Sequence, residues 1–405
     1  MTTTATAPAP VEPATRRSVW LAVLVLAAAG FLALTVELSP AGLLTRIAPD
    51  LHASVAATGS LTALYSLGNA ILALPLTVLA VRFARRVSLA AALLVFVIGN
   101  AVVAFSSDLA PALVGRFIAG GAHGLLMSLA PAVAVGLVGH QREARALSMI
   151  IGANTLGIAL GAPLASLAGT TLGWRTAFFA AAAIALICAV LLAVLVPPMR
   201  AQATKSLGLL SAARQPGVLR FGIGWMLMML AYMGVLTYLD PYLEQLDAPA
   251  WVTSLSLFVF GAGGFAGVAI AGRIVARSRM TALIAMPLLM AACFAALSLG
   301  ITSVPVVVAL LFVWGIAFAG LVLVWQQALL LTGHRAPEMS MSIGVVLTQA
   351  GMAAGAALGG LIVSTAGVTA TPLLGLVVTL AALTLLIKAA PILRRAETDR
   401  NAAHA

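Results

Sequence analysis

Charged residues are scarce in this chain, and acidic ones are the scarcest. Only 8% of the 405 residues are charged, 11 are Asp or Glu, and 62% are hydrophobic. A soluble domain carries about a quarter charged residues, so this composition cannot cover a water-facing surface. The composition excludes an ordinary soluble protein and predicts an integral membrane protein whose main partner is the lipid bilayer.

Cysteine and catalytic motifs are also lacking. Cys188 and Cys293 each lie inside an apolar stretch, so no disulfide, metal or thiol chemistry is expected. The nucleotide-binding pattern G-x-x-x-x-G-K-[ST] does not occur, and neither does H-E-x-x-H. We therefore expect no cofactor, no metal and no enzymatic activity, and an intramembrane enzyme is the least favoured reading.

The chain is rich in apolar stretches of about 20 residues, the length that spans a bilayer. They predict an all-α membrane protein with twelve transmembrane helices and no soluble domain between them. The predicted helices cover residues 18–48, 55–80, 87–106, 109–138, 146–170, 174–196, 218–240, 251–272, 280–300, 304–331, 340–365 and 369–390.

Short repeated segments divide the predicted helices into two halves of six. SMIIG at 148–152 matches SMSIG at 340–344, and the basic segments VRFARRVSL and GRIVARSRM follow the second and eighth helices. Both matches have nearly the same offset, which favours a parallel repeat with a substrate site between the halves. The predicted organisation is a disordered N-terminal tail (1–17), a first half (18–196), a linker (197–217), a second half (218–390) and a C-terminal tail (391–405), with 396–405 disordered.

The basic residues predict the orientation. If the N-terminus is cytoplasmic, that side holds 19 of the 22 Lys and Arg residues, because only Arg46, Arg116 and Arg175 fall elsewhere. This bias is the positive-inside signal. It explains the net charge of +11 without nucleic acid, and it leaves basic side chains able to contact anionic lipid. Both termini and the linker are expected to be cytoplasmic, in a bacterial-type inner membrane.

Several segments resemble the major facilitator superfamily, and within it the arabinose-efflux-permease-like, twelve-span drug:proton antiporters. ELSPAGLLTRIAPDL resembles the signature of the first helix, and GRFIAGGAHG resembles the helix 4 motif, with Arg116 as its arginine. GANTLGIALGAPLASLAG, followed by GWRTAF, resembles the antiporter motif of helix 5, with Ala162 in place of the usual glycine. The resemblance implies the major facilitator fold and, through the helix 5 motif, export.

VRFARR resembles the loop motif that follows the second helix in this superfamily. Val81 replaces the usual aspartate, and Ala84 replaces a glycine. Arg82, Arg85 and Arg86 are either topology anchors or a latch that binds helix C-terminal carbonyls in one conformation.

Small residues recur along the fifth predicted helix. Gly152, Gly157 and Gly161 precede Pro163, and a spacing of four places Gly157 and Gly161 on one face. Small faces let helices approach closely, and proline removes a helical hydrogen bond. We expect helices 5 and 11 to abut the opposite half and to bend there, with plain packing as the alternative.

Polar residues inside the spans are candidates for the substrate cavity. Helices 1, 4, 7 and 10 line the cavity in the resembling superfamily, and His123 follows Arg116 by seven residues on a similar helix face. Each such residue is also compatible with a local helix–helix hydrogen bond. The candidates are Tyr232, Trp325, Gln326, His123 and Asn154.

Glu37 and Arg116 are the only formal charges deep within the predicted spans. At 1.5 Å per residue, Glu37 lies about 5 Å and Arg116 about 13 Å from the middle of its helix, both toward the outer side. A carboxylate in hydrocarbon costs roughly 3 kcal/mol on insertion scales, so a partner is expected. We predict an ion pair between Glu37 and Arg116. The pair is either static or opens when Glu37 takes up a proton.

The sequence thus favours a secondary transporter that exchanges protons for small organic molecules such as drugs or metabolites. An exporter or importer of sugars, nucleosides or amino acids is the first alternative, and a transporter-like sensor without flux is the second. A monomer is the default expectation.

Overall fold

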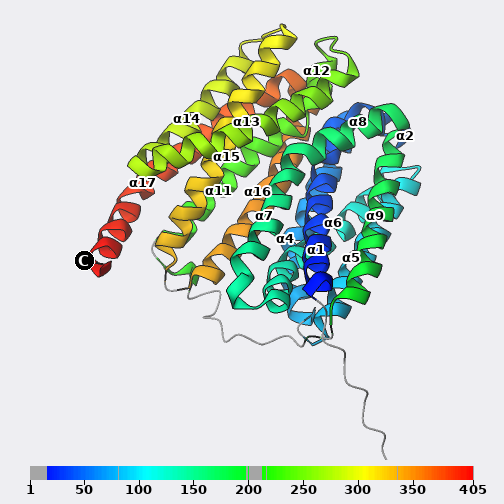
Figure 1. Cartoon of the computed structure of the whole chain (residues 1–405). Coiled ribbons are helices and arrows are strands. Elements are labelled where there is room, and N and C mark those ends of the chain that lie inside the picture. Colours follow the sequence, from blue (N-terminus) through cyan, green and yellow to red (C-terminus); the bar gives the residue numbers. More distant parts are fainter. Residues whose placement is uncertain are drawn as a thin grey trace, which may run out of the picture.

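A computed structural model describes residues 16–80, 82–197, 199, 212–215, 217–334 and 336–404 (Figure 1). Twelve helical stretches of this part are long and apolar enough to cross a membrane. The elements are α1 (Arg16–Leu38), η1 (Ser39–Gly42), α2 (Leu44–Asp50), α3 (Val55–Thr58), α4 (Ser60–Ala80), α5 (Arg85–Phe105), α6 (Leu109–Val138), η2 (His140–Arg142), α7 (Glu143–Leu156), η3 (Gly157–Gly161), α8 (Ala162–Leu172), α9 (Trp174–Leu195), α11 (Val218–Leu236), α12 (Leu239–Glu244), α13 (Ala250–Arg277), α14 (Arg279–Ser298), α15 (Val304–Thr332), α16 (Pro337–Ala366), η4 (Val368–Ala370) and α17 (Thr371–His404).

The all-α fold with twelve spans is as predicted, but the last helix is longer than expected. α17 continues to His404, so the prediction of a disordered segment from residue 396 is wrong. The segment after Pro391 contains no further proline or glycine and is rich in alanine, which has the highest helix propensity. The predicted N-terminal tail, except its last two residues, and residues 198, 200–211 and 216 of the predicted linker lie outside the described residues.

The two halves lie side by side, the first at the right and the second at the left of Figure 1. Their helices pair in the same way. α4 packs on α6 as α13 packs on α15, α5 on α9 as α14 on α17, and α1 on α7 and η3 as α11 on α16. Between the halves, α4 packs against α16, and α13 packs against η3 and α8. The packing is therefore that of a parallel repeat around a two-fold-like axis.

The fifth span bends where the sequence predicts a bend. Pro163 cannot donate an N–H to the carbonyl of Ala159 four residues earlier, and the helix widens into a π-helical turn over Gly157–Gly161. This turn faces the second half, because Gly261 of α13 sits against the backbone of Ala159.

The glycines of this span do not face the opposite half as expected. Gly157 lies against the backbone of Phe31, and Gly161 lies against Thr35, so both serve close packing on α1 of their own half. Gly152 has open space around it. The spacing of four placed Gly157 and Gly161 on one face, but it could not say which helix that face meets.

Candidate functional site

The first helix ends at a proline-induced break. Pro40 has no N–H, so the carbonyl of Val36, four residues earlier, loses its partner within the helix. The chain then tightens into the 3₁₀ turn Ser39–Gly42. The Ser39 hydroxyl donates to the freed Val36 carbonyl at 2.9 Å. Glu37 is the residue next to this break.

Arg116 of α6 completes the capping of α1. Its Nη1 donates to the carbonyl of Val36 at 2.8 Å and its Nη2 to the carbonyl of Glu37 at 3.1 Å. Its Nε donates to the carbonyl of Leu61 on α4 at 3.0 Å. The ring of Tyr65 covers the guanidinium, whose carbon lies 4.1 Å from the ring centroid, and the Tyr65 hydroxyl donates to Ala33 at 3.2 Å. Arg116, which is fully buried, thus ties α1, α4 and α6 together.

The predicted ion pair between Glu37 and Arg116 is not formed. The two residues are neighbours, as expected, but in the described structure the guanidinium binds the main-chain carbonyl of Glu37 and not its carboxylate. The carbonyls at the helix end carry partial negative charge and are left without partners, so they compete successfully for the arginine. Spacing along two helices could bring the residues together, but it could not predict which oxygen the guanidinium binds.

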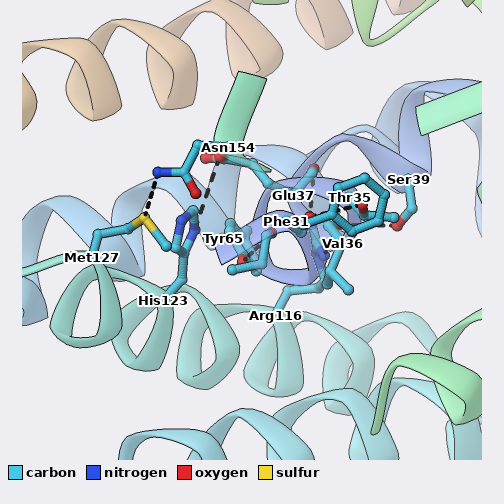
Figure 2. A network of polar contacts seen from close by, with 11 residues as sticks. Phe31, Thr35, Val36, Glu37, Ser39, Tyr65, Arg116, His123, Met127 and Asn154 are labelled. Carbon is cyan, nitrogen blue, oxygen red and sulfur yellow. Dashed lines mark hydrogen bonds and ion pairs between the residues drawn. The ribbon is translucent and has the colours of Figure 1, made fainter. Parts of the chain in front are cut away.

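The Glu37 carboxyl points instead toward His123 (Figure 2). Its Oε2 is 3.9 Å from Nδ1 of His123 on α6, and its side chain interacts with the amide of Gln349 on α16. Its Oε1 is buried and has no hydrogen-bond partner among the described residues. Because Gln349 belongs to the second half, the carboxyl sits at the junction between the halves.

His123 and Asn154 flank this carboxyl within the first half. His123 is buried with its ring centroid 5.7 Å from that of Tyr65. Asn154, on α7, is half-buried and its amide nitrogen is 3.7 Å from the sulfur of Met127 (Figure 2). The structure therefore gathers Glu37, Arg116 and His123 near the end of α1, while Asn154 lies against Gly30, about two turns earlier on the same helix.

Two candidates of the second half, Tyr232 and Trp325, lie in an aromatic cluster between α11, α13 and α15. Tyr232 stacks on Phe318, with centroids 4.1 Å apart, and is within electrostatic range of Glu37. Trp325 stacks on Trp225 at 4.4 Å, and the Trp225 indole donates to Thr348 at 2.7 Å. Gln326, the residue after Trp325 on α15, is exposed.

Two participants were missed as site residues. Gln349 was visible in the sequence as a polar residue within a span, but nothing there indicated that it meets Glu37. Trp225 gave no signal, because stacking on Trp325 depends on how α11 and α15 are rotated toward each other.

The arginines of the loop motif make no side-chain hydrogen bond with the described residues. Arg82 is exposed, Arg85 and Arg86 are half-exposed, and the loop is held by main-chain and serine contacts. The N–H of Arg85 donates to the carbonyl of Met199 at 2.8 Å, and Ser88 donates to Ala80 at 3.0 Å. The predicted latch, in which these arginines bind helix C-terminal carbonyls, is thus not formed in this conformation.

Hydrogen bonds join the halves at the end where α1 terminates. Asp240 of α12 accepts from the N–H and the hydroxyl of Thr45 on α2, both at its Oδ2, at 3.0 and 2.8 Å. Its Oδ1 accepts from Thr253 of α13 at 3.1 Å. Asp240 is buried, so the two bonds from Thr45 form a shielded contact between the halves.

Two further contacts join the halves at the same end, and together with the bonds of Asp240 they form what we call the seal. The hydroxyls of Ser166 on α8 and Ser254 on α13 are 2.9 Å apart, and Ser166 is also 3.1 Å from the carbonyl of Gly42. The hydroxyl of Tyr238 lies between the carbonyls of Ala356, at 2.8 Å, and Ala56, at 3.4 Å. These hydrogen bonds join the halves at this end, so the structure is closed there.

A family model described as Major Facilitator Superfamily matches residues 19–346. The chain belongs to this superfamily. It is a multi-pass membrane transporter, and the superfamily resemblance inferred from the sequence is confirmed.

Solved structures with the same fold include three transporters of different kinds. A bacterial homolog of the human lysosomal transporter Spinster, inward-facing and unoccupied, is 14% identical, with a TM-score of 0.72 over 94% of this chain and 97% of that chain. The nucleoside transporter NupG is 14% identical, with a TM-score of 0.72 over 92% and 99%. The human organic anion transporter MFSD10 (TETRAN) is 20% identical, with a TM-score of 0.64 over 93% and 100%. At these identities the likeness shows the fold alone.

The capping role of Arg116 predicts a stability effect that is independent of Glu37. Arg116→Gln removes the guanidinium donor from three buried carbonyls, of which that of Val36 keeps the Ser39 hydroxyl, and we expect a loss of about 2 kcal/mol or more, because each unsatisfied group costs roughly 1–3 kcal/mol. Glu37→Gln should not restore this loss, since the carboxylate is not the partner. Thermal unfolding of the single and double variants in detergent measures the coupling energy between the side chains at positions 37 and 116. Recovery of wild-type stability in the double variant would show that the two side chains act as an ion pair.

The seal at Asp240 predicts a shift between conformations. Asp240→Ala removes the oxygen that accepts both bonds from Thr45, and we expect the population open at this end to rise by about tenfold or more, because bonds to a charged group contribute about 1.5–3 kcal/mol each. Spin labels on cysteines at Ala57 and Gln245, which are exposed on either side of the seal, report the distance between the halves. Asp108→Ala, which removes an exposed carboxylate outside the seal, is the matched control. An unchanged distance distribution in Asp240→Ala contradicts the role of the seal.

Proposed function

We propose that this transporter exports small organic molecules in exchange for protons, by alternating access, and that Glu37 is the coupling carboxyl. The observation that carries the proposal is the position of Glu37. It is buried at the junction of the halves and has one oxygen without a partner, while the neighbouring arginine is committed to main-chain carbonyls.

This position gives the carboxyl two environments during a transport cycle. Arg116, His123 and Asn154 belong to the first half and move with Glu37, whereas Gln349 belongs to the second half and does not. Rocking of the halves therefore changes the polar contacts of the carboxyl while its own half stays intact. A group whose surroundings change in this way can take up a proton in one state and release it in the other.

We assign the closed end to the outer side of the membrane. The positive-inside bias supports this assignment, because the basic loops lie at the opposite end. Arg175, one of the few basic residues on the closed side, forms an ion pair with Asp50 there. Under this assignment the structure is inward-facing, both termini are cytoplasmic, and the protein sits in the inner membrane of a bacterial-type cell.

The substrate is proposed to bind between Glu37 and the aromatic cluster of the second half. Tyr232 and the Trp225–Trp325 stack offer flat apolar contacts, while His123, Asn154 and Gln326 offer polar ones. Helix 5, with Gly152, Gly157, Gly161 and Pro163, resembles the antiporter motif and supports export. Arg82, Arg85 and Arg86 are proposed to act as a latch in the state that is closed at the cytoplasmic end.

Glu37→Gln tests the coupling role. It keeps the shape of the protonated acid but cannot release a proton, so we expect efflux driven by a pH gradient to be lost while downhill exchange is retained. A susceptibility panel on cells with and without the gene, at two external pH values, first identifies a transported compound. Proteoliposomes with that compound then give both rates.

Glu244→Gln, an exposed glutamate near the end of α12, is the matched control and should behave as wild type. Undiminished gradient-driven efflux in Glu37→Gln would move the coupling carboxyl elsewhere. Gradient-driven uptake in place of efflux would instead support an importer of sugars, nucleosides or amino acids.

The orientation has its own test. A cysteine placed at position 202, in the linker, should resist a membrane-impermeant thiol reagent added outside intact cells, while one at position 247 should react. The two native cysteines are buried and give a low background. The opposite labelling pattern would reverse the assignment of the closed end.

A further inference from the structure

A cavity of about 600 Å³ opens at the end of the second half opposite the seal. It lies between the end of α13, the start of α14, the end of α15 and α17. Its volume falls within the roughly 300–1,000 Å³ of sites that hold a small molecule or headgroup. It lies away from the junction of the halves and from Glu37.

Three guanidinium groups line this cavity. They belong to Arg277 at the end of α13, Arg279 at the start of α14 and Arg394 on α17. The Nε of Arg279 donates to the side-chain oxygen of Gln327 at 3.0 Å, which orients that guanidinium at the cavity wall. Arginines that line one cavity are suited to a phosphate group, whose oxygens accept paired N–H donors.

Apolar residues that face outward lead to two of these arginines. Ile387, two turns before Arg394 on the same face of α17, is 48% exposed, and Leu380 two turns earlier is 44% exposed. On α13, Ile270 precedes Arg277 by seven residues and is 39% exposed. Both arginines lie at or near the ends of spans that run to Arg277 and Ala396. Each therefore stands where a lipid-facing stripe meets the headgroup region.

We propose that this cavity binds the phosphate of an anionic phospholipid, with the acyl chains along the exposed faces of α13 and α17. The apolar stripes favour a lipid over a free phosphate ion, which needs the arginines but not the stripes. Basic pockets between spans on the cytoplasmic side are a recurrent mode of anionic-lipid binding, and the proposed orientation places the cavity on that side.

Two double variants separate a local site from the general positive charge of this end. Arg277→Gln with Arg394→Gln removes two arginines that line the cavity. Arg273→Gln with Arg395→Gln removes two exposed arginines of the same helices that do not line it. The change in net charge is identical, so only a site formed by the cavity distinguishes the pairs.

The measurement is retention of phosphatidylglycerol against phosphatidylcholine by the purified full-length protein, followed by native mass spectrometry. We expect the wild-type protein to prefer phosphatidylglycerol. The preference should fall about tenfold in the Arg277→Gln, Arg394→Gln variant and stay unchanged in the Arg273→Gln, Arg395→Gln variant. Equal losses in both pairs, or none in either, overturn the proposal. Displacement of phosphatidylglycerol by excess inorganic phosphate also overturns it, because the ligand would then be the free ion. Should the cavity pair fail to give monodisperse protein, Arg394→Gln alone, compared with Arg395→Gln, provides the same test.

Discussion

The three bonds from Arg116 to the carbonyls of Val36, Glu37 and Leu61 hold the first half together where α1 stops being an α-helix. A proline at residue 40 removes the N–H that would continue the helix, and in a bilayer no water is available to satisfy the freed carbonyl. A buried arginine is costly by itself, but three carbonyl acceptors and the Tyr65 ring offset that cost. The glycines of α4 and α6 complete the arrangement, because Gly68 and Gly120 let these two helices approach at the level of Tyr65.

The commitment of Arg116 to the backbone determines the chemistry of Glu37. A carboxylate paired directly with a guanidinium of its own half would have the same partner in every conformation of the transporter. Glu37 has only a distant histidine from its own half and an amide from the other half. Its surroundings therefore depend on how the halves are placed, which a static ion pair would not allow. Arg116 was expected to pair with the Glu37 carboxylate. Because it binds main-chain carbonyls instead, the contacts of that carboxyl depend on the position of the second half.

Much of this architecture could be predicted from the sequence, because membrane insertion imposes strong and local rules. The twelve spans follow from length and hydropathy, and the bend at Pro163 follows from a missing N–H. The proximity of Glu37 and Arg116 followed from their depth in the membrane. What could not be predicted depends on how helices are rotated about their axes. This applies to the faces met by Gly157 and Gly161, to the Trp225–Trp325 stack and to Gln349. The capping role of Arg116 could be predicted in part, because Pro40 in the sequence already indicates that a carbonyl of the preceding turn lacks a partner.

The connection after α1 joins the seal to Glu37 within a few residues. Val36 and Glu37 are fixed by Arg116, the carbonyl of Gly42 contacts Ser166, and Thr45 donates to Asp240 of the opposite half. The 3₁₀ turn between these points is short and buried, so it cannot absorb a large displacement by uncoiling into solvent. When the halves part at the closed end, the bonds of Thr45 and the contact of Glu37 with Gln349 must both change, because each crosses the same boundary. In the proposed transport cycle, the opening of the seal and the exposure of Glu37 are coupled through one continuous segment of backbone, which Arg116 anchors at the Glu37 end.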